Sequence, residues 1–193
     1  MRVAIVSDFF PDFIGGAQSS MREQRLALEK AGHHVVVVTA TRAWGSRYRR
    51  DQHGLWVRPR FVMPGVELPV IRNGDRTRSH VARLLDDERV DVVHVFGLSH
   101  AAMDAAAAAG IRVVHTVHTF YWTSDDNWHA FLGPLTRWLL RRLTKAKIAR
   151  SRLAEKPVDS VLRNLTLATA KRADAVVSPS AHQAHDLEAA GVS

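Results

Sequence analysis

Residues 2–38 read RVAIVSDFFPDFIGGAQSSMREQRLALEKAGHHVVVV, and this stretch decides the fold. Its first apolar run, residues 3–7, is rich in β-branched side chains and predicts a buried strand. A loop containing Gly15 and Gly16 leads into a predicted helix at 17–30, which Gly32 ends. A second apolar run, residues 35–38, predicts the next strand. A strand, helix and strand in this order form a parallel pair with a right-handed crossover.

The rest of the chain continues the alternation of strands and helices. Residues 41–75 contain several glycines and prolines and are predicted to be irregular, with 55–58 as a candidate third strand. Further strands are predicted at 90–96, 112–117 and 174–178, and further helices at 76–89, 99–109, 134–153, 159–172 and 180–190. We therefore expect an α/β fold: one Rossmann-like domain with a parallel sheet, spanning residues 1–193.

Composition narrows the classes of protein. The chain has 193 residues, 46% of them hydrophobic, which is ample for one domain with its own core. The absence of cysteine excludes a disulfide framework and a thiolate metal site. No apolar run approaches the roughly 20 residues of a membrane span, and the N-terminus has no signal-peptide pattern. We expect a cytoplasmic protein, and its formal net charge of +8 favours an anionic partner.

A ligand site is predicted at the carboxyl ends of the strands, where open α/β sheets bind their ligands. Gly15 and Gly16 lie there, immediately before a helix whose free N–H groups suit a phosphate. A tight strand-to-helix turn would explain the same two glycines without any ligand. The pattern lacks the second and third glycines of G-x-G-x-x-G and the lysine of a P-loop, so neither of those motifs is present.

Two histidines belong to the strand predicted at 112–117 and to its end. His115 and His118 are three residues apart, so on a strand their side chains point to opposite faces and cannot share a metal ion. We interpret His115 as a core residue and His118 as a residue of the carboxyl edge that could donate to an oxyanion or hydroxyl. The aromatic residues that follow, 120–122, could stack on a sugar or simply pack.

The helix predicted at 134–153 is basic. It has no acidic residue from 134 to 152, and four of its cations share one face: Arg137, Arg141, Lys145 and Arg152. A basic amphipathic helix is typical of a membrane-surface contact, although a solvated helix packed on the core has the same pattern.

Several of these segments, in order along the chain, resemble family 4 of the retaining glycosyltransferases. The resemblance covers the opening "IVSDFFP…GG" at 5–16, "LEKAGHHV" at 28–35, "DVVHV" at 91–95 and "ADAVVSPS" at 173–180. The segment "HTVHTFY" at 115–121 is similar to that of the lipid-modifying members, the diacylglycerol glucosyltransferases and phosphatidylinositol mannosyltransferases.

The resemblance implies a GT-B fold of two Rossmann-like domains, of which this chain supplies the N-terminal, acceptor-side one. The C-terminal domain, which binds the nucleotide sugar and carries an E-x7-E motif, would be absent, so we expect the chain alone to be inactive. His118 would be catalytic, and Asp8, Gly15, Gly16 and Tyr121 would bind the donor phosphate or the acceptor. Arg137, Arg141, Lys145 and Arg152 would contact an anionic membrane on the cytoplasmic side.

The resemblance also implies the substrates. The donor would be a nucleotide sugar such as a GDP- or UDP-hexose, with no metal and no other cofactor, and the acceptor a lipid or glycolipid. Mannosyl transfer in glycolipid biosynthesis is one such reaction. The alternative is a noncatalytic domain of the same fold that binds a lipid or a partner. No nucleic-acid partner is expected, because no helix-turn-helix, zinc-finger or RRM pattern is present.

Overall fold

The computed structural model describes residues 1–7, 16–41, 45–58, 74–97, 99–118 and 166–192. Its strands are β1 (Arg2–Ser7), β2 (His34–Ala40), β3 (Tyr48–Asp51), β4 (Gly54–Val57), β5 (Val92–Phe96), β6 (Arg112–Thr116) and β7 (Ala175–Val177). Its helices are α1 (Gly16–Lys30), α2 (Asp75–Asp87), α3 (His100–Ala108) and α6 (Ala181–Ala189), with a further helical stretch at 166–170. All of these elements except β3 were predicted, and most of their ends agree within a few residues.

The described strands form one seven-stranded sheet in the order β3-β4-β2-β1-β5-β6-β7. All neighbours are parallel except β3 and β4. The strand order reverses beside β1, which pairs with β2 on one side and β5 on the other. This is the doubly wound arrangement, and it confirms the predicted Rossmann-like fold.

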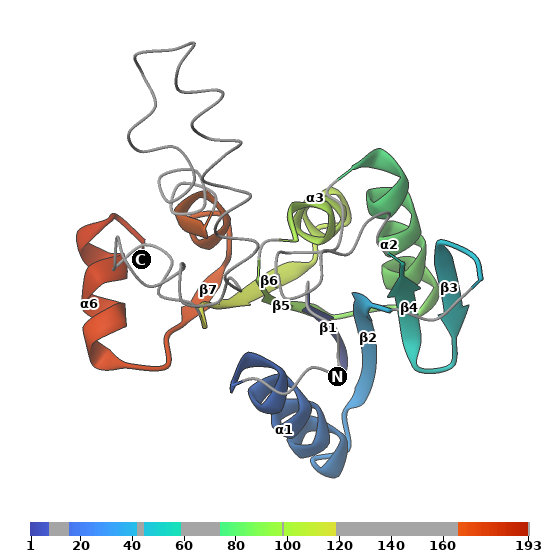
Figure 1. Ribbon diagram of the computed structural model, residues 1–193, viewed down its shortest axis with the longest axis horizontal. Helices are drawn as coiled ribbons and strands as arrows, with labels where there is room; N and C mark the ends of the chain where they lie inside the picture. The colour runs from blue at the N-terminus through green and yellow to red at the C-terminus, as the bar shows by residue number, and fades with distance from the viewer. Residues whose placement is uncertain (8–15, 42–44, 59–73, 98, 119–165, 193) are drawn as a thin grey trace, which may run out of the picture.

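Helices cover both faces of the sheet. In Figure 1, α1 lies on one face, and α2 and α3 lie together on the other. The larger apolar cluster joins α2 and α3 to alternate residues of the strands, such as Val6, Val38 and Val95. The smaller cluster joins Met21 of α1 to Ile5 and Phe96. Both faces are therefore covered by apolar side chains, which explains why the central strands read as continuous apolar runs.

The predicted stop of α1 at Gly32 is confirmed by its backbone. Gly32 has a φ of +80°, its N–H donates to the Glu29 carbonyl, and the His33 N–H donates to the Leu28 carbonyl. These two bonds form a Schellman motif, whose left-handed residue is usually glycine because it has no Cβ. The turn delivers the chain directly into β2.

Two expectations about local structure were wrong. Residues 48–51 form an edge strand within the segment expected to be irregular, and they pair with β4 in an antiparallel hairpin. The strand reads Tyr-Arg-Arg-Asp and is largely exposed, so no apolar run reveals it. Gly54 enables the turn: its φ is +145°, and a Cβ there would lie 1.8 Å from the Val37 carbonyl oxygen. Helix α2 ends at Asp87 rather than 89, because Arg89 adopts a left-handed φ of +48°.

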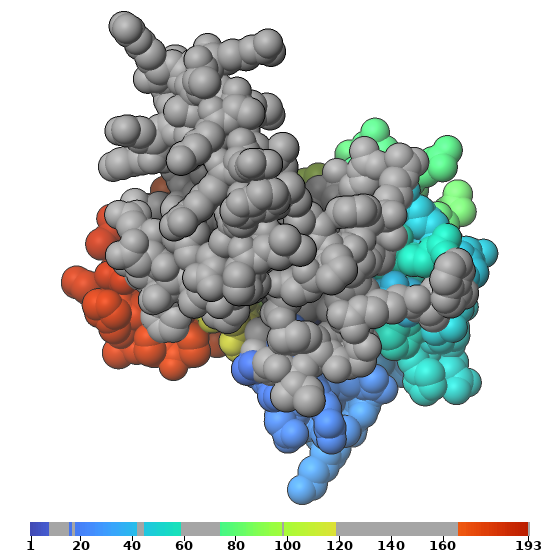
Figure 2. Space-filling view, in the orientation of Figure 1, coloured from blue at the N-terminus to red at the C-terminus, as the bar shows by residue number. Residues whose placement is uncertain are grey.

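Figure 2 shows how the elements reach the surface. Helix α6 forms one flank of the molecule, the β3–β4 hairpin the opposite flank, and α1 a third. The sheet order places β7 and β3 at the two edges, in agreement with this view.

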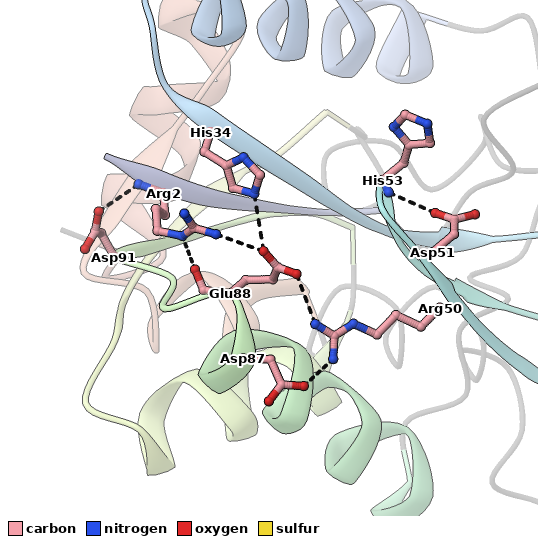
Figure 3. A network of polar contacts seen from close by, with 8 residues as sticks. All are labelled: Arg2, His34, Arg50, Asp51, His53, Asp87, Glu88 and Asp91. Carbon is pink, nitrogen blue, oxygen red and sulfur yellow. Dashed lines mark hydrogen bonds and ion pairs between the residues drawn. The ribbon is translucent and has the colours of Figure 1, made fainter.

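The amino ends of the strands are joined by a network of charged side chains (Figure 3). Glu88 is its centre: one carboxylate oxygen accepts from Arg2 at 2.9 Å and lies 3.3 Å from Nε2 of His34, and the other accepts from Arg50 at 3.0 Å. Arg50 also pairs with Asp87. Burial tends to raise the pKa of Glu88, but the hydrogen bonds from Arg50, His34 and Arg2 outweigh it and hold the pKa below its usual value. The network ties the end of α2 to three strands.

Candidate functional site

The carboxyl ends of four parallel strands lie side by side. Ser7 of β1 pairs with Phe96 of β5, Phe96 with Thr116 of β6, and Thr116 with Val177 of β7. The reversal of strand order falls between β1 and β5, where doubly wound sheets open a crevice for ligands. The predicted carboxyl edge is thus formed from these strand ends.

His118 lies two residues beyond β6, on the face covered by α1. Its imidazole ring stacks on the phenyl ring of Phe96, with centroids 5.3 Å apart and planes 12° apart. Burial lowers the pKa of His118, so the ring is neutral near pH 7. Its Nε2 is enclosed and has no hydrogen-bond partner within the described residues. A neutral imidazole with one uncommitted nitrogen can donate to, or accept from, a ligand hydroxyl.

His94 completes a column of three rings. Its ring centroid lies 4.4 Å from that of Phe96, and its Nε2 lies 2.6 Å from the Thr116 hydroxyl oxygen. Burial, with smaller contributions from His115 and His118, lowers the pKa of His94 to about 4. His94 is therefore a neutral, hydrogen-bonded side chain beneath Phe96.

His115 lies on the opposite face of the sheet, as predicted from its spacing to His118. It is 1% exposed, and its Nε2 lies 2.9 Å from the Gly97 carbonyl oxygen, to which it donates. Burial outweighs this hydrogen bond and lowers its pKa to about 4. The interpretation of His115 as a core residue is confirmed. Within the described ranges, no three His, Cys, Asp or Glu side chains are grouped so that they could hold a metal ion.

Gly16 is the first residue of α1 and is exposed. A Cβ built at this position would meet no atom within 4 Å. Packing against the described residues therefore gives no reason for glycine here, in contrast to Gly54. Glycine places no side chain at the start of α1, the end of a helix that suits an anionic group.

The turn from β7 into α6 adds polar groups at the same edge. The Ser180 hydroxyl caps α6 by accepting from the Gln183 N–H at 3.2 Å, and the Ser178 hydroxyl donates to the Gln183 side-chain oxygen at 3.1 Å. Gln183 is fully buried. These contacts organise the turn, so we assign them to the fold.

The other predicted site residues lie outside the described residues. They are Asp8, Gly15, Tyr121, Arg137, Arg141, Lys145 and Arg152, together with the basic helix predicted at 134–153. Their roles stay predictions. Among the described helices, none combines the length and the apolar content that crossing a membrane requires.

The family model described as Glycosyltransferase Family 4 matches residues 14–193, nearly the whole chain. This chain belongs to glycosyltransferase family 4. The match includes α1, the ring column and the turn into α6. The resemblance read from the sequence motifs is confirmed.

Two curated relatives of this family-4 chain are lipid-modifying glycosyltransferases. One subunit of the phosphatidylinositol N-acetylglucosaminyltransferase of Arabidopsis thaliana is 36% identical over 65% of this chain and 29% of its own length. Alpha-monoglucosyldiacylglycerol synthase of Acholeplasma laidlawii is 28% identical over 72% of this chain and 34% of its own length. The matched part is about a third of each relative's length.

A solved structure gives the same fold. Sucrose-phosphate synthase from Thermosynechococcus elongatus superposes with a TM-score of 0.55 at 16% identity, covering 97% of this chain and 44% of the synthase. The family-4 chain thus has the Rossmann-like fold of one half of a GT-B protein.

Two residues beside the candidate site escaped the sequence analysis: His94 and Thr116. Each belongs to an apolar or β-branched run that reads as strand core. Only the pairing of β5 with β6 brings them together. Thr116 could have been found from the sequence, because residues two apart on a strand point to the same face, and Thr116 precedes His118 by two.

Proposed function

We propose that this chain is the acceptor-binding half of a retaining glycosyltransferase that transfers a hexose, or an N-acetylated hexosamine, from a nucleotide sugar to a membrane lipid. The observation that carries the proposal is the neutral His118 at the carboxyl edge, with an Nε2 that no described residue engages. Family membership over residues 14–193 supports the reaction class. The names of the two lipid-modifying relatives support a lipid acceptor.

His118 would hold a hydroxyl of the reacting sugar, or of the acceptor, by a hydrogen bond. A neutral imidazole suits this task, because it can donate from Nε2 without placing a full positive charge beside the substrate. Gly16 would allow the diphosphate or the acceptor to approach the start of α1, and Gly15, Asp8 and Tyr121 would line the same crevice.

The donor would be a UDP- or GDP-sugar held by a second Rossmann-like domain. The chain covers only about a third of the relatives' length and 44% of the synthase, which leaves room in those proteins for such a domain. Without it, this chain would bind the acceptor but transfer no sugar. No metal and no other cofactor enter the proposal.

The acceptor would be reached at the cytoplasmic face of the membrane. Arg137, Arg141, Lys145 and Arg152 would contact anionic lipid head groups, each contributing about 1 kcal/mol near the surface. Replacing all four with glutamate should abolish sedimentation with anionic vesicles, and unchanged sedimentation would exclude this contact.

The proposal is tested in a protein that joins this chain to a donor-binding domain. Transfer from UDP-glucose, UDP-N-acetylglucosamine and GDP-mannose to diacylglycerol or phosphatidylinositol in vesicles is measured for the wild type, His118→Ala and His53→Ala. His53 is an exposed histidine of the β3–β4 turn and serves as the matched control. We expect His118→Ala to lower the rate about 100-fold with little change in the thermal midpoint, and His53→Ala to have no effect. Full activity of His118→Ala would refute the role of His118, and absence of transfer to every lipid would favour a noncatalytic domain.

A further inference from the structure

Phe96 is an enclosed aromatic side chain at the carboxyl edge. It is 1% exposed and packs in the α1-face cluster with Val3, Ile5 and Met21. It ends β5, between Ser7 of β1 and Thr116 of β6. A large ring enclosed in this way keeps one orientation.

His118 stacks on that ring. It follows the last residue of β6 by two positions, beyond the β5–β6 register, and the N–H of the preceding Val117 still donates to the Val177 carbonyl of β7. Its Nε2 has no partner within the described residues, so no hydrogen bond from them to this nitrogen fixes the plane of the imidazole. Among the described residues, the stack on Phe96, with planes 12° apart, restrains the ring. Stacking also keeps water from one face of the imidazole.

His94 also contacts the Phe96 ring, from two residues earlier in β5. Its ring lies 4.4 Å from the phenyl centroid, and its Nε2 is held 2.6 Å from the Thr116 hydroxyl. Thr116 precedes His118 by two residues and lies on the same face of the strand. One hydrogen bond thus joins the base of the column to the strand that carries His118.

We infer that Phe96 is a positioning residue for His118, and that it sets the plane in which Nε2 of His118 meets the substrate, with the His94–Thr116 hydrogen bond as its support. The inference deepens the proposed function and rests on it for its catalytic meaning. Phe96 itself need not touch the substrate. If the His118 imidazole turned so that its Nε2 moved by a fraction of an ångström, the substrate would still bind but the transfer would be slower.

The test separates positioning from packing. NMR titration of the 193-residue chain gives the pKa of His118 in the wild type, Phe96→Leu, Phe96→Tyr and Val35→Ala. Val35 belongs to the same cluster and is 7% exposed, so Val35→Ala is a matched loss of packing away from the rings. We expect Phe96→Leu to raise the pKa of His118 toward the ordinary value, because water reaches the uncovered face. Phe96→Tyr and Val35→Ala should leave this pKa unchanged.

In the protein joined to a donor-binding domain, Phe96→Leu should lower kcat about tenfold with KM nearly unchanged, and Phe96→Tyr should restore kcat. If Phe96→Leu does not fold, Phe96→Met preserves more of the volume and replaces it in both measurements. An unchanged pKa of His118 in the Leu or Met variant, or an equal rise in Val35→Ala, would overturn the inference. Full activity of His118→Ala would instead refute the proposed function and leave the NMR result standing.

Discussion

The two ends of the sheet differ in how their partly buried polar groups are accommodated. At the amino end, Glu88 is charged and meets Arg2, Arg50 and His34, so the carboxylate at the centre of the network is satisfied by other side chains (Figure 3). At the carboxyl end, His94 and His118 are kept neutral by burial, and Nε2 of His118 is left without a described partner.

The difference separates residues that hold the fold from residues that are available to a ligand. The polar groups of a satisfied network already have partners and are not available to a substrate. Removing one of them lowers the free energy of unfolding. An enclosed nitrogen without a partner costs stability, and a ligand that supplies the missing hydrogen bond removes that cost. Of such nitrogens, Nε2 of His118 lies at the carboxyl edge beyond the end of β6. We therefore assign the amino end to the fold and the carboxyl end to the proposed site.

The largest expected effect is that a substitution at the amino end lowers stability but not activity, whereas one at the carboxyl end lowers activity but not stability. Glu88→Gln should lower the free energy of unfolding by about 2 kcal/mol, because two arginines lose a charged partner, and should leave the rate of sugar transfer nearly unchanged. His118→Ala should lower the rate of sugar transfer and leave the free energy of unfolding nearly unchanged. Urea unfolding and transfer assays on both variants check the pattern, and a rate loss in Glu88→Gln that matches that of His118→Ala would break the comparison.

The next effect is the dependence of stability on pH. Burial lowers the pKa of His94 and of His115 from 6.5 to about 4. A lowered pKa means that the unfolded chain binds these protons first as the pH falls, so the stability is full above pH 6.5 and is lost down to about pH 4. The slope should be up to about 1.4 kcal/mol per pH unit for each histidine.

The amino end should respond in a lower window. The lowered pKa of Glu88 contributes stability above its unfolded value of 4.5, and this is lost only as the pH falls through the folded pKa. Urea unfolding at a series of pH values should show that His94→Gln reduces the slope above pH 4.5, while Glu88→Gln changes it only below. A Glu88→Gln effect on the slope near pH 6 would contradict this assignment.

The smallest effect concerns the backbone beside the Glu88 network. Arg89 is exposed and has a left-handed φ of +48°, which costs an L-residue roughly 1 kcal/mol. Arg89→Gly should therefore stabilise the protein by about 0.5 kcal/mol. Arg83→Gly, on an exposed position inside α2, should destabilise it by about 1 kcal/mol. A higher thermal midpoint for Arg89→Gly and a lower one for Arg83→Gly would confirm the strain at Arg89. Lower midpoints for both variants would exclude it.

The sequence predicted the central strands because they are buried on both faces and read as apolar runs, as in residues 35–38. It missed β3 because an exposed edge strand needs no apolar side chains, and Tyr48 and Arg50 are held by partners on α2 that lie far away in the chain. The turn at Gly54 depends on the approach of Val37, which also arises only in the folded sheet.

The candidate site was predicted in part for the same reason. The sequence placed His118 and the end of the strand at 90–96, which is Phe96, at the carboxyl edge, whereas His94 is hidden inside that strand. The stack of Phe96 on His118 depends on the register of β5 against β6, and no local pattern encodes that register. The signs of the pKa shifts likewise depend on burial, which the fold determines.

The most direct measurement follows the histidine ring resonances of the 193-residue chain as bicelles containing phosphatidylinositol or diacylglycerol are added. If the carboxyl edge binds the acceptor, the resonances of His118 and, more weakly, His94 should shift in a saturable way. Those of His34 and His53, at the amino end and the β3–β4 turn, should stay in place. Shifts confined to His34 and His53, or no saturable shift of His118 with either lipid, would contradict the assignment of the carboxyl edge as the site.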